Sequence, residues 1–135
     1  MHIFLSHWSG DRWVARKLAE AIEGCGATTF LDCRDVDHGD DFEERIVEEA
    51  HRADELAVLL TPRALARHYV WMEIGGFWFL RKRVIIIRYG VDTELIATNE
   101  RIPILIKRSI SVELNEIDDY LERVRERCRV GGYEI

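Results

Sequence analysis

The chain has 135 residues, of which 47% are hydrophobic and 33% charged, and this length and composition predict one globular domain over residues 1–135. No apolar run approaches the roughly 20 residues of a membrane span, and residues 3–5 are apolar with no basic segment before them, so we expect neither a membrane protein nor a secretory signal, and a cytoplasmic location. The net charge of −6 disfavours direct binding to nucleic acid.

Five short apolar runs alternate with amphipathic segments along the chain. The runs predict buried strands at 3–5, 28–31, 56–60, 84–87 and 102–106. Helical spacing predicts apolar stripes on Val14, Leu18, Ala21, Ile22 and Cys25, on Phe42, Ile46, Ala50 and Ala53, and on Ile117, Leu121, Val124 and Cys128. Between 89 and 101 the pattern is weaker, and we expect a loop with a short helix near 94–99. The alternation predicts an α/β sandwich, in which helices joined by right-handed crossovers cover both faces of one parallel sheet.

The carboxyl ends of the predicted strands carry most of the chemically versatile side chains. Ligands of such sheets bind outside these ends. The segments that follow the first four strands are 6–11, 32–40, 61–63 and 88–90. A further helix is expected to open at Glu73, after the third of these segments, so its carboxylate is predicted to face the same crevice.

Glu73 is the one charge in the run from Tyr69 to Leu80, which is otherwise apolar apart from Tyr69 itself. Aromatic walls exclude water, so a carboxylate there is a candidate for stabilising positive charge that develops during a reaction. The alternative is structural, because the helix dipole alone favours an acid in the first turn of a helix.

Several common catalytic motifs do not occur in the sequence. Neither G-x-G-x-x-G nor a P-loop is present, which disfavours a dehydrogenase or an NTPase, and no G-x-S-x-G elbow supports a serine hydrolase. The five histidines lack metal-ligand spacing, and Cys25, Cys33 and Cys128 form no C-x-x-C pair. We therefore expect no metal site and no disulfide framework.

The strand-end segments, taken together, resemble a TIR (Toll/interleukin-1 receptor) domain of the bacterial stand-alone type. The similarity covers nearly the whole chain, through residues 3–7 and 9–11, 30–32 with Arg34 and Asp35, 39–42, 58–62 and 71–75. It implies a flavodoxin-like three-layer sandwich with a five-stranded parallel sheet in the order 2-1-3-4-5. In the enzymatic branch of the family it implies cleavage of the bond between nicotinamide and ribose in NAD, with Glu73 at the catalytic position.

The same resemblance and the strand-end positions define a candidate substrate site. Its expected members are Ser6, His7, Trp8, Asp32, Arg34, Thr61, Tyr69 and Trp71. Trp8 or Trp71 would stack on a flat base and Arg34 would meet phosphate. Tyr69 stands where the family often has tryptophan, so an aromatic wall is kept with a changed shape. Four of these residues also have a stated structural alternative. Ser6 would satisfy backbone groups, Asp32 would cap a turn, and the two tryptophans would pack in the core.

The charges along the chain also suggest self-association. Residues 35–49 contain eight acids and one base, while basic residues gather at 81–83 and 101–108. We expect the segment with Asp35, Asp37, Gly39, Asp40 and Asp41 to meet a basic patch on another copy. Active TIR assemblies often complete each pocket in this way.

The sequence therefore predicts an NAD-consuming TIR domain that makes ADP-ribose or a cyclic or base-exchanged product as a signal, as similar bacterial domains do in defence against phage. NAD would be the substrate, with no further cofactor, and separate chains would sense and respond. A TIR scaffold without chemistry remains the alternative, and an enzyme similar to nucleoside deoxyribosyltransferases is a third reading.

Overall fold

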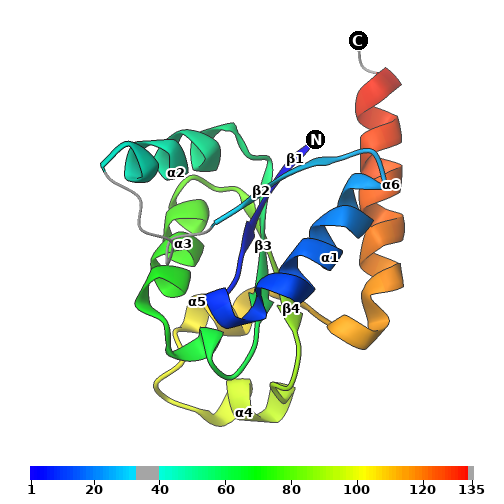
Figure 1. The fold of residues 1–135 in the computed structure, drawn as a ribbon. Helices are drawn as coiled ribbons and strands as arrows, with labels where there is room; N and C mark the ends of the chain where they lie inside the picture. Colours follow the sequence, from blue (N-terminus) through cyan, green and yellow to red (C-terminus); the bar gives the residue numbers. More distant parts are fainter. Residues whose placement is uncertain (33–39, 134–135) are drawn as a thin grey trace.

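Five parallel strands form one sheet in the order β2-β1-β3-β4-β5 in the computed structural model, which describes residues 1–32 and 40–133. The strands are β1 (His2–Ser6), β2 (Thr28–Leu31), β3 (Glu55–Leu60), β4 (Arg83–Arg88) and β5 (Ile110–Glu113). The helices are α1 (Arg12–Glu23), α2 (Asp40–Arg52), α3 (His68–Phe79), α4 (Thr93–Thr98), α5 (Ile104–Arg108) and α6 (Ile117–Tyr133). This is the predicted flavodoxin-like α/β architecture, with α1 and α6 on one side of the sheet and α2 and α3 on the other (Figure 1).

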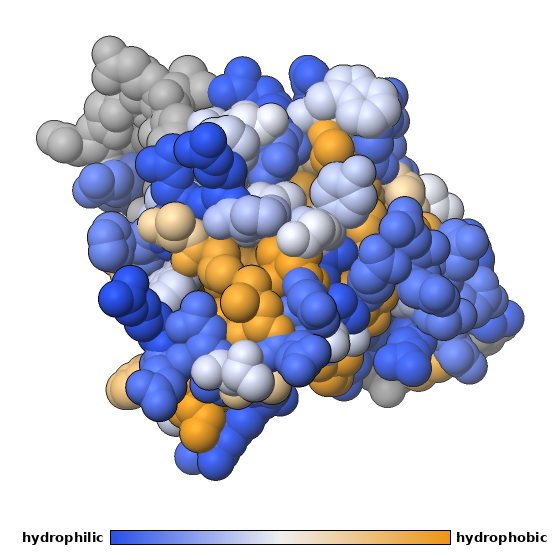
Figure 2. All heavy atoms as spheres, turned by 90° about the horizontal axis from the view of Figure 1, so that it is seen from below, coloured by the Kyte–Doolittle hydropathy of each residue, from blue (hydrophilic) through white to orange (hydrophobic). Residues whose placement is uncertain are grey.

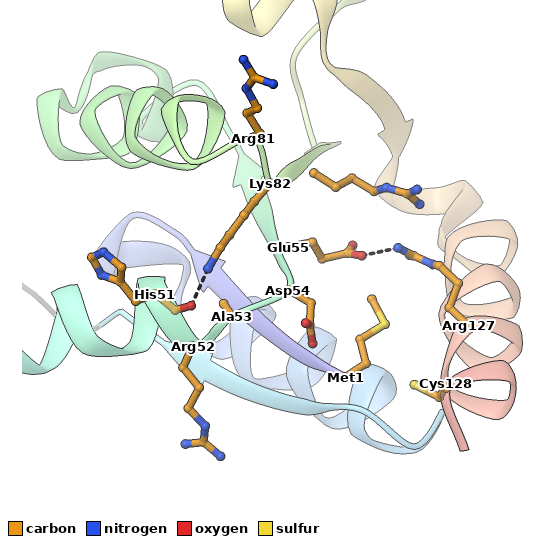
Figure 3. Close-up of a pocket in the computed structure, with 12 residues that line it drawn as sticks. Met1, His51, Arg52, Ala53, Asp54, Glu55, Arg81, Lys82, Arg127 and Cys128 are labelled. Carbon is orange, nitrogen blue, oxygen red and sulfur yellow. Dashed lines mark hydrogen bonds and ion pairs between the residues drawn. The ribbon is translucent and has the colours of Figure 1, made fainter. Parts of the chain in front are cut away.

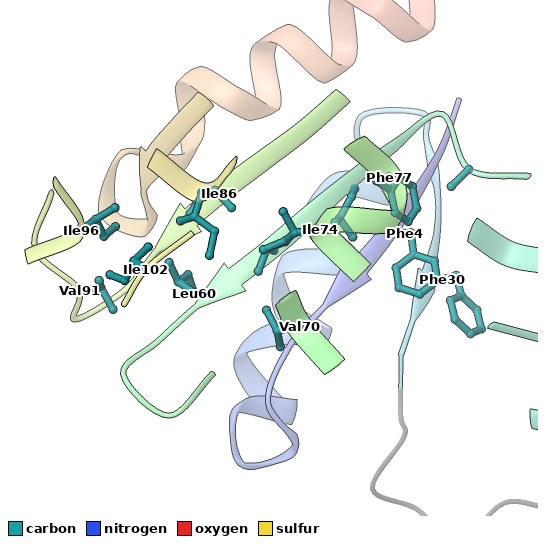
Figure 4. Packing of buried hydrophobic residues seen from close by; sticks show 14 of the residues in the cluster. Phe4, Phe30, Leu60, Val70, Ile74, Phe77, Ile86, Val91, Ile96 and Ile102 are labelled. Atoms are coloured by element: carbon teal, nitrogen blue, oxygen red, sulfur yellow. The ribbon is translucent and has the colours of Figure 1, made fainter. Parts of the chain in front are cut away.

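Alternation along the strands divides the core between the two faces of the sheet. Phe4, Leu56, Val58, Leu60 and Ile86 pack with residues from α2, α3, α4 and α5, whereas their neighbours Ile3, Leu5, Ala57, Leu59, Ile85 and Ile87 pack with α1 and α6. Figure 4 shows part of the first cluster, in which Phe4 lies between Phe30 and Phe77. Strands buried on both faces are the reason that the sequence shows continuous apolar runs.

The fifth strand is not where the apolar run predicts it. Residues 104–108 form α5, which begins after Pro103, and β5 follows at Ile110–Glu113. Ile102 and Ile106 are buried while Ile104 is 58% exposed, which is a four-residue spacing that belongs to a helix and not to a strand. β5 lies at the edge of the sheet and its side chains are exposed or only half-buried, so it left little hydrophobic signal.

The helix predictions are largely confirmed. Leu18 and Ile22 lie on the buried face of α1, but Ala21 is exposed and Ala15 and Ala19 take its place. The short helix expected near 94–99 is α4. Over the described ranges, none of the helices combines the length and the apolarity that crossing a membrane requires.

We predict that Phe4→Ala lowers the free energy of unfolding by about 3–5 kcal/mol, through lost burial and the cavity that remains. The Phe4 ring is fully buried, and its centroid lies 5.1 Å from that of Phe30 and 5.5 Å from that of Phe77. Phe79→Ala is the matched control, because it removes the same atoms from a ring that is 82% exposed on α3. Urea denaturation should show less than about 0.5 kcal/mol for the control, and equal losses in both variants would contradict the described core.

Candidate functional site

Ser6 and Glu73 join the carboxyl end of β1 to the middle of α3. The buried positions of α3 are Val70, Glu73, Ile74 and Phe77, which is the spacing of one helical face, so Glu73 occupies the stripe that packs on the sheet. Ser6 follows Phe4 on the same side of β1 and is fully buried. Its hydroxyl donates a hydrogen bond of 2.7 Å to Glu73 Oε1. Glu73, which is 7% exposed, is thereby held near the carboxyl ends of the strands, where ligands of this architecture bind.

The expectation that Glu73 opens a helix is wrong. α3 begins at His68, directly after Arg67 with its extended backbone, and Glu73 is the sixth residue of the helix. The dipole effect falls off within the first turn and therefore does not explain an acid at this position. The helix starts early because Tyr69 and Val70 already belong to its packing face: Val70 is fully buried and Tyr69 packs against the same cluster.

Asp32 is the second carboxylate at this edge of the sheet. β1 and β2 pair in register up to Leu5 and Leu31, so Asp32 comes one step beyond, beside Ser6. Its backbone N–H donates to the Leu5 carbonyl at 3.2 Å, and the residue is 2% exposed. Two buried acids therefore lie near Ser6. Asp32 follows the neighbouring strand β2, and Glu73 on α3 accepts a hydrogen bond from the Ser6 hydroxyl.

A cavity of about 380 Å³ lies between α2 and α3 and reaches Glu73. Its other walls are mostly apolar, among them Phe4, Ile46, Phe77 and Leu80. Charges act strongly in such surroundings because little water screens them. Seen from the side of the strands' carboxyl ends, apolar surface lies in the middle of the molecule with hydrophilic side chains around it (Figure 2).

Trp71 does not share this cavity. It lines a separate hollow of about 460 Å³ with Arg67, His68 and Arg101, and its indole N–H donates to the Leu65 carbonyl at 2.9 Å. Residues two apart on a helix point to different sides, which separates Trp71 from Glu73. The predicted grouping of these two residues on one pocket wall is therefore not what the structure shows.

Thr61, Tyr69 and His7 form the frame of the site. Thr61 donates to Asp11 Oδ2 at 2.6 Å and accepts from the Ala64 N–H at 3.2 Å, which ties the end of β3 to the loop after β1. The Tyr69 hydroxyl donates to the His7 carbonyl at 2.9 Å, and the buried His7 ring bonds to the Trp8 carbonyl through Nδ1 at 2.8 Å. These contacts hold the loop after β1 against α3.

Arg63 and Arg67 are additions that the sequence reading missed. Their guanidinium carbons lie 5.8 and 5.9 Å from the centre of the Trp8 ring, within the range of cation–π attraction. Both are exposed and follow β3, so they bring positive charge to the carboxyl-end side of the sheet. The sequence pattern that could have identified them is the pair of basic residues just after the third apolar run.

The remaining predicted residues cannot be placed at the site. Arg34, Asp35, Asp37 and Gly39 lie outside the described residues. Asp40 and Asp41 begin α2, but only their backbone is described.

Comparisons with known proteins agree with this architecture. A family model described as TIR domain matches residues 3–125. Among curated proteins, none matches the sequence. The solved TIR domain of the Toll-related receptor TRR-2 from Hydra magnipapillata is 18% identical, with a TM-score of 0.66 over 94% of this chain and 97% of that one. A 2-desoxiribosyltransferase from Leishmania mexicana is 10% identical, with a TM-score of 0.67 over 90% of this chain and 97% of that one. At these identities the two structures show a shared fold.

We predict that Gly10→Ala destabilises the protein by about 1–3 kcal/mol and displaces Trp8, because overpacking forces its neighbours to move. A Cβ atom at Gly10 would lie 2.1 Å from the Trp8 ring. Gly75→Ala is the control: nothing lies within 4 Å of a Cβ there, so the glycine is not needed for packing. Alanine at this helical position should raise stability by about 0.5–1 kcal/mol. Thermal unfolding and near-ultraviolet circular dichroism measure both, and changes of the same sign would contradict the described Trp8 packing.

Proposed function

The chain belongs to the TIR domain family, and from that premise we propose that it cleaves NAD at the bond between nicotinamide and ribose. The observation that carries the proposal is Glu73, a buried carboxylate on the packing stripe of α3, held by Ser6 and reaching a cavity. An apolar residue would fit this stripe at lower cost, since a buried charge must be compensated. A reaction that needs a fixed negative charge supplies a reason for it.

The chemistry needs one carboxylate and no general acid. When the bond between ribose C1′ and the pyridinium nitrogen breaks, its electron pair goes to the nitrogen and nicotinamide leaves as a neutral base. Positive charge then develops on the ribosyl ring, and Glu73 would stabilise it electrostatically. Water then forms the new bond at C1′ and releases a proton to the solvent, giving ADP-ribose, whereas attack by the substrate's own adenine or by another base gives a cyclic or base-exchanged product. The carboxylate pair of ordinary glycosidases is not required.

Other residues have supporting roles in this proposal. Ser6 would fix the carboxylate, and Asp32 beside it would bind ribose hydroxyls. Arg63 and Arg67 would bind the pyrophosphate, because guanidinium groups pair well with phosphate oxygens. The sequence predicted this role for Arg34. The product would act as a signal in the cytoplasm, in bacterial defence against phage, with other chains as sensor and effector.

A scaffold without chemistry is the second candidate function. It is favoured by three large apolar side chains that α3 exposes, Met72, Trp78 and Phe79. In that case the bond between Ser6 and Glu73 only positions α3. An activity similar to deoxyribosyltransferases needs a separate test, in which the protein is incubated with a deoxynucleoside and an acceptor base and base exchange is measured.

The proposal includes self-association through the acidic segment 35–41 and a basic surface on another copy, such as residues 101–108. The two patches differ, so the contact is heterologous and builds open strands. Exposed ion pairs contribute about 0–1 kcal/mol each, so a contact made of them is weak and sensitive to salt.

We predict that Glu73→Gln lowers NAD turnover by about 100-fold or more, the scale expected when one preorganised electrostatic group is lost. Glutamine keeps the shape and can still accept the Ser6 bond, so the melting temperature should change little. The assay is chromatography of NAD and its products after incubation with the purified protein.

Glu55→Gln is the control for that variant. Glu55 is also a buried carboxylate, 1% exposed, but it lies at the opposite end of β3. Glu55 has no part in the proposed reaction, so folded Glu55→Gln should keep turnover near that of the unchanged protein. Near-normal activity of Glu73→Gln would remove Glu73 from the reaction, and a wild-type protein that never consumes NAD would favour the scaffold.

We also predict that specific activity rises with protein concentration and falls as salt is added, because the proposed contact joins opposite charges. Asp40→Lys combined with Asp41→Lys should lower activity without unfolding the protein, although lysine in the first turn of α2 should lower the melting temperature somewhat. Activity assays paired with sedimentation velocity measure this, with Phe79→Ser as a second variant. Loss of association in Phe79→Ser alone would place the contact on α3 instead, and constant specific activity from a monomer at every concentration would contradict self-association.

A further inference from the structure

A cavity of about 1020 Å³ lies at the amino ends of the strands, opposite the bond between Ser6 and Glu73. Its walls come from the last turn of α2, the starts of β3 and β4, and the C-terminal part of α6 (Figure 3). The volume is at the upper end of the range for small-molecule sites. No residue of the proposed catalytic site lines it.

The cavity is positively charged although the chain is acidic. Five cationic side chains line it, Arg52, Arg81, Lys82, Arg83 and Arg127, against the two carboxylates of Asp54 and Glu55. The formal charge of these residues is +3, whereas the whole chain has −6. A concave surface of one sign concentrates small ions of the opposite sign.

Three of these cations already have partners. Arg127 forms an ion pair with Glu55, and Arg52 lies 3.7 Å from Glu49. Lys82 Nζ donates to the Ala50 and His51 carbonyls at 2.8 and 2.5 Å, so it caps the end of α2, as the dashed line to His51 in Figure 3 illustrates.

Arg81 and Arg83 are the other two cations that line the cavity. Arg83 pairs with Glu55 in the sheet register, but the Glu55 carboxylate already accepts from Arg127 and, at 2.8 Å, from the Tyr120 hydroxyl. Among the described residues, neither Arg81 nor Arg83 has a carboxylate within ion-pair distance. In Figure 3 the Arg81 side chain stands at the rim and extends away from Glu55.

The backbone at Arg81 is a second, independent observation. α3 ends in a Schellman motif, with Arg81 N–H bonded to the Trp78 carbonyl and Lys82 N–H to the Phe77 carbonyl, both at 2.9 Å. Arg81 takes the left-handed position of this motif with φ of 58°, where glycine is the usual residue. The sequence therefore places a long cation at a position where its own backbone is unfavourable, beside a cavity that is already positive.

We propose that this cavity binds a small anion that carries two or more phosphate groups, with Arg83 as a ligand and with Arg81, turned inward from the rim, as a second. Guanidinium groups bind phosphate oxygens through paired hydrogen bonds, and Lys82 and Arg127 add to the positive field. The volume accommodates inorganic pyrophosphate and also a nucleoside di- or triphosphate.

Isothermal titration calorimetry tests the proposal, with inorganic pyrophosphate and ATP as separate probes at low ionic strength. We expect saturable binding of pyrophosphate that weakens by about 10-fold or more in Arg81→Gly combined with Arg83→Ala. Tighter binding of ATP than of pyrophosphate would show that the nucleoside contributes, and equal affinities would assign the site to the phosphates alone. The control is Arg16→Ala combined with Arg123→Ala, which removes the same charge from exposed positions on α1 and α6 that line none of the cavities described above. It should weaken binding by no more than about 2-fold.

Arg81→Gly alone separates binding from folding. Glycine suits the left-handed position, so the melting temperature should hold or rise while pyrophosphate binding weakens. The absence of saturable binding to the unchanged protein would overturn the proposal, as would equal weakening by the two double variants. The proposal would also be overturned if the double variant of Arg81 and Arg83 lost self-association but still bound pyrophosphate. In that case the basic surface would contact the acidic segment of another copy.

Discussion

The buried hydrogen bond from Ser6 to Glu73 is the constraint on which the rest of the candidate site depends. Burial of a carboxylate is unfavourable unless polar partners replace water, and Ser6 is one such partner. Because Ser6 ends β1 and Glu73 lies in the middle of α3, the bond fixes the position of the helix along the strand. The bond from Tyr69 to the His7 carbonyl is a second tie between the same two elements, one turn earlier on α3. The carboxylate is thus held from both the strand and the helix, which is the preorganisation that electrostatic catalysis requires.

A second buried acid, Glu55, shows what a structural carboxylate looks like in the same molecule. Glu55 is paired with a cation, Arg127, and accepts from the Tyr120 hydroxyl. Burial, and after it the neighbouring Glu55 charge, raises the pKa of Tyr120 far above its usual value, so this hydroxyl stays protonated and keeps donating. Glu73, at the other end of the sheet, accepts a hydrogen bond from the Ser6 hydroxyl and lines the cavity between α2 and α3. The two buried acids therefore differ in their described surroundings.

The parts of the fold that sequence could predict are those in which a pattern and a burial environment coincide. β1, β3 and β4 are buried on both faces and appear as apolar runs, whereas β5 is an exposed edge strand and the nearby apolar run at 102–106 belongs mainly to α5. Glu73 was identifiable because a lone charge in an apolar run is unusual, but the start of α3 was not, since no capping side chain marks it. Trp71 was grouped with Glu73 by proximity in sequence, and the helical turn separates them. Arg63 and Arg67 meet Trp8 only through tertiary structure, which no local pattern encodes.

α2 lies between the two cavities. It contributes Ile46, Val47 and Ala50 to the cavity that reaches Glu73, its last turn lines the amino-end cavity, and His51 lines both. Lys82 holds the last turn of α2 through the Ala50 and His51 carbonyls, so one lysine at the amino end sets the position of a wall of the Glu73 cavity. An anion beside Lys82 would compete with these carbonyls for its ammonium group. It would influence the Glu73 cavity only to the extent that its affinity differs between two positions of α2, because a ligand shifts an equilibrium by its differential affinity alone. Lys82 is therefore the residue at which the two cavities would be linked.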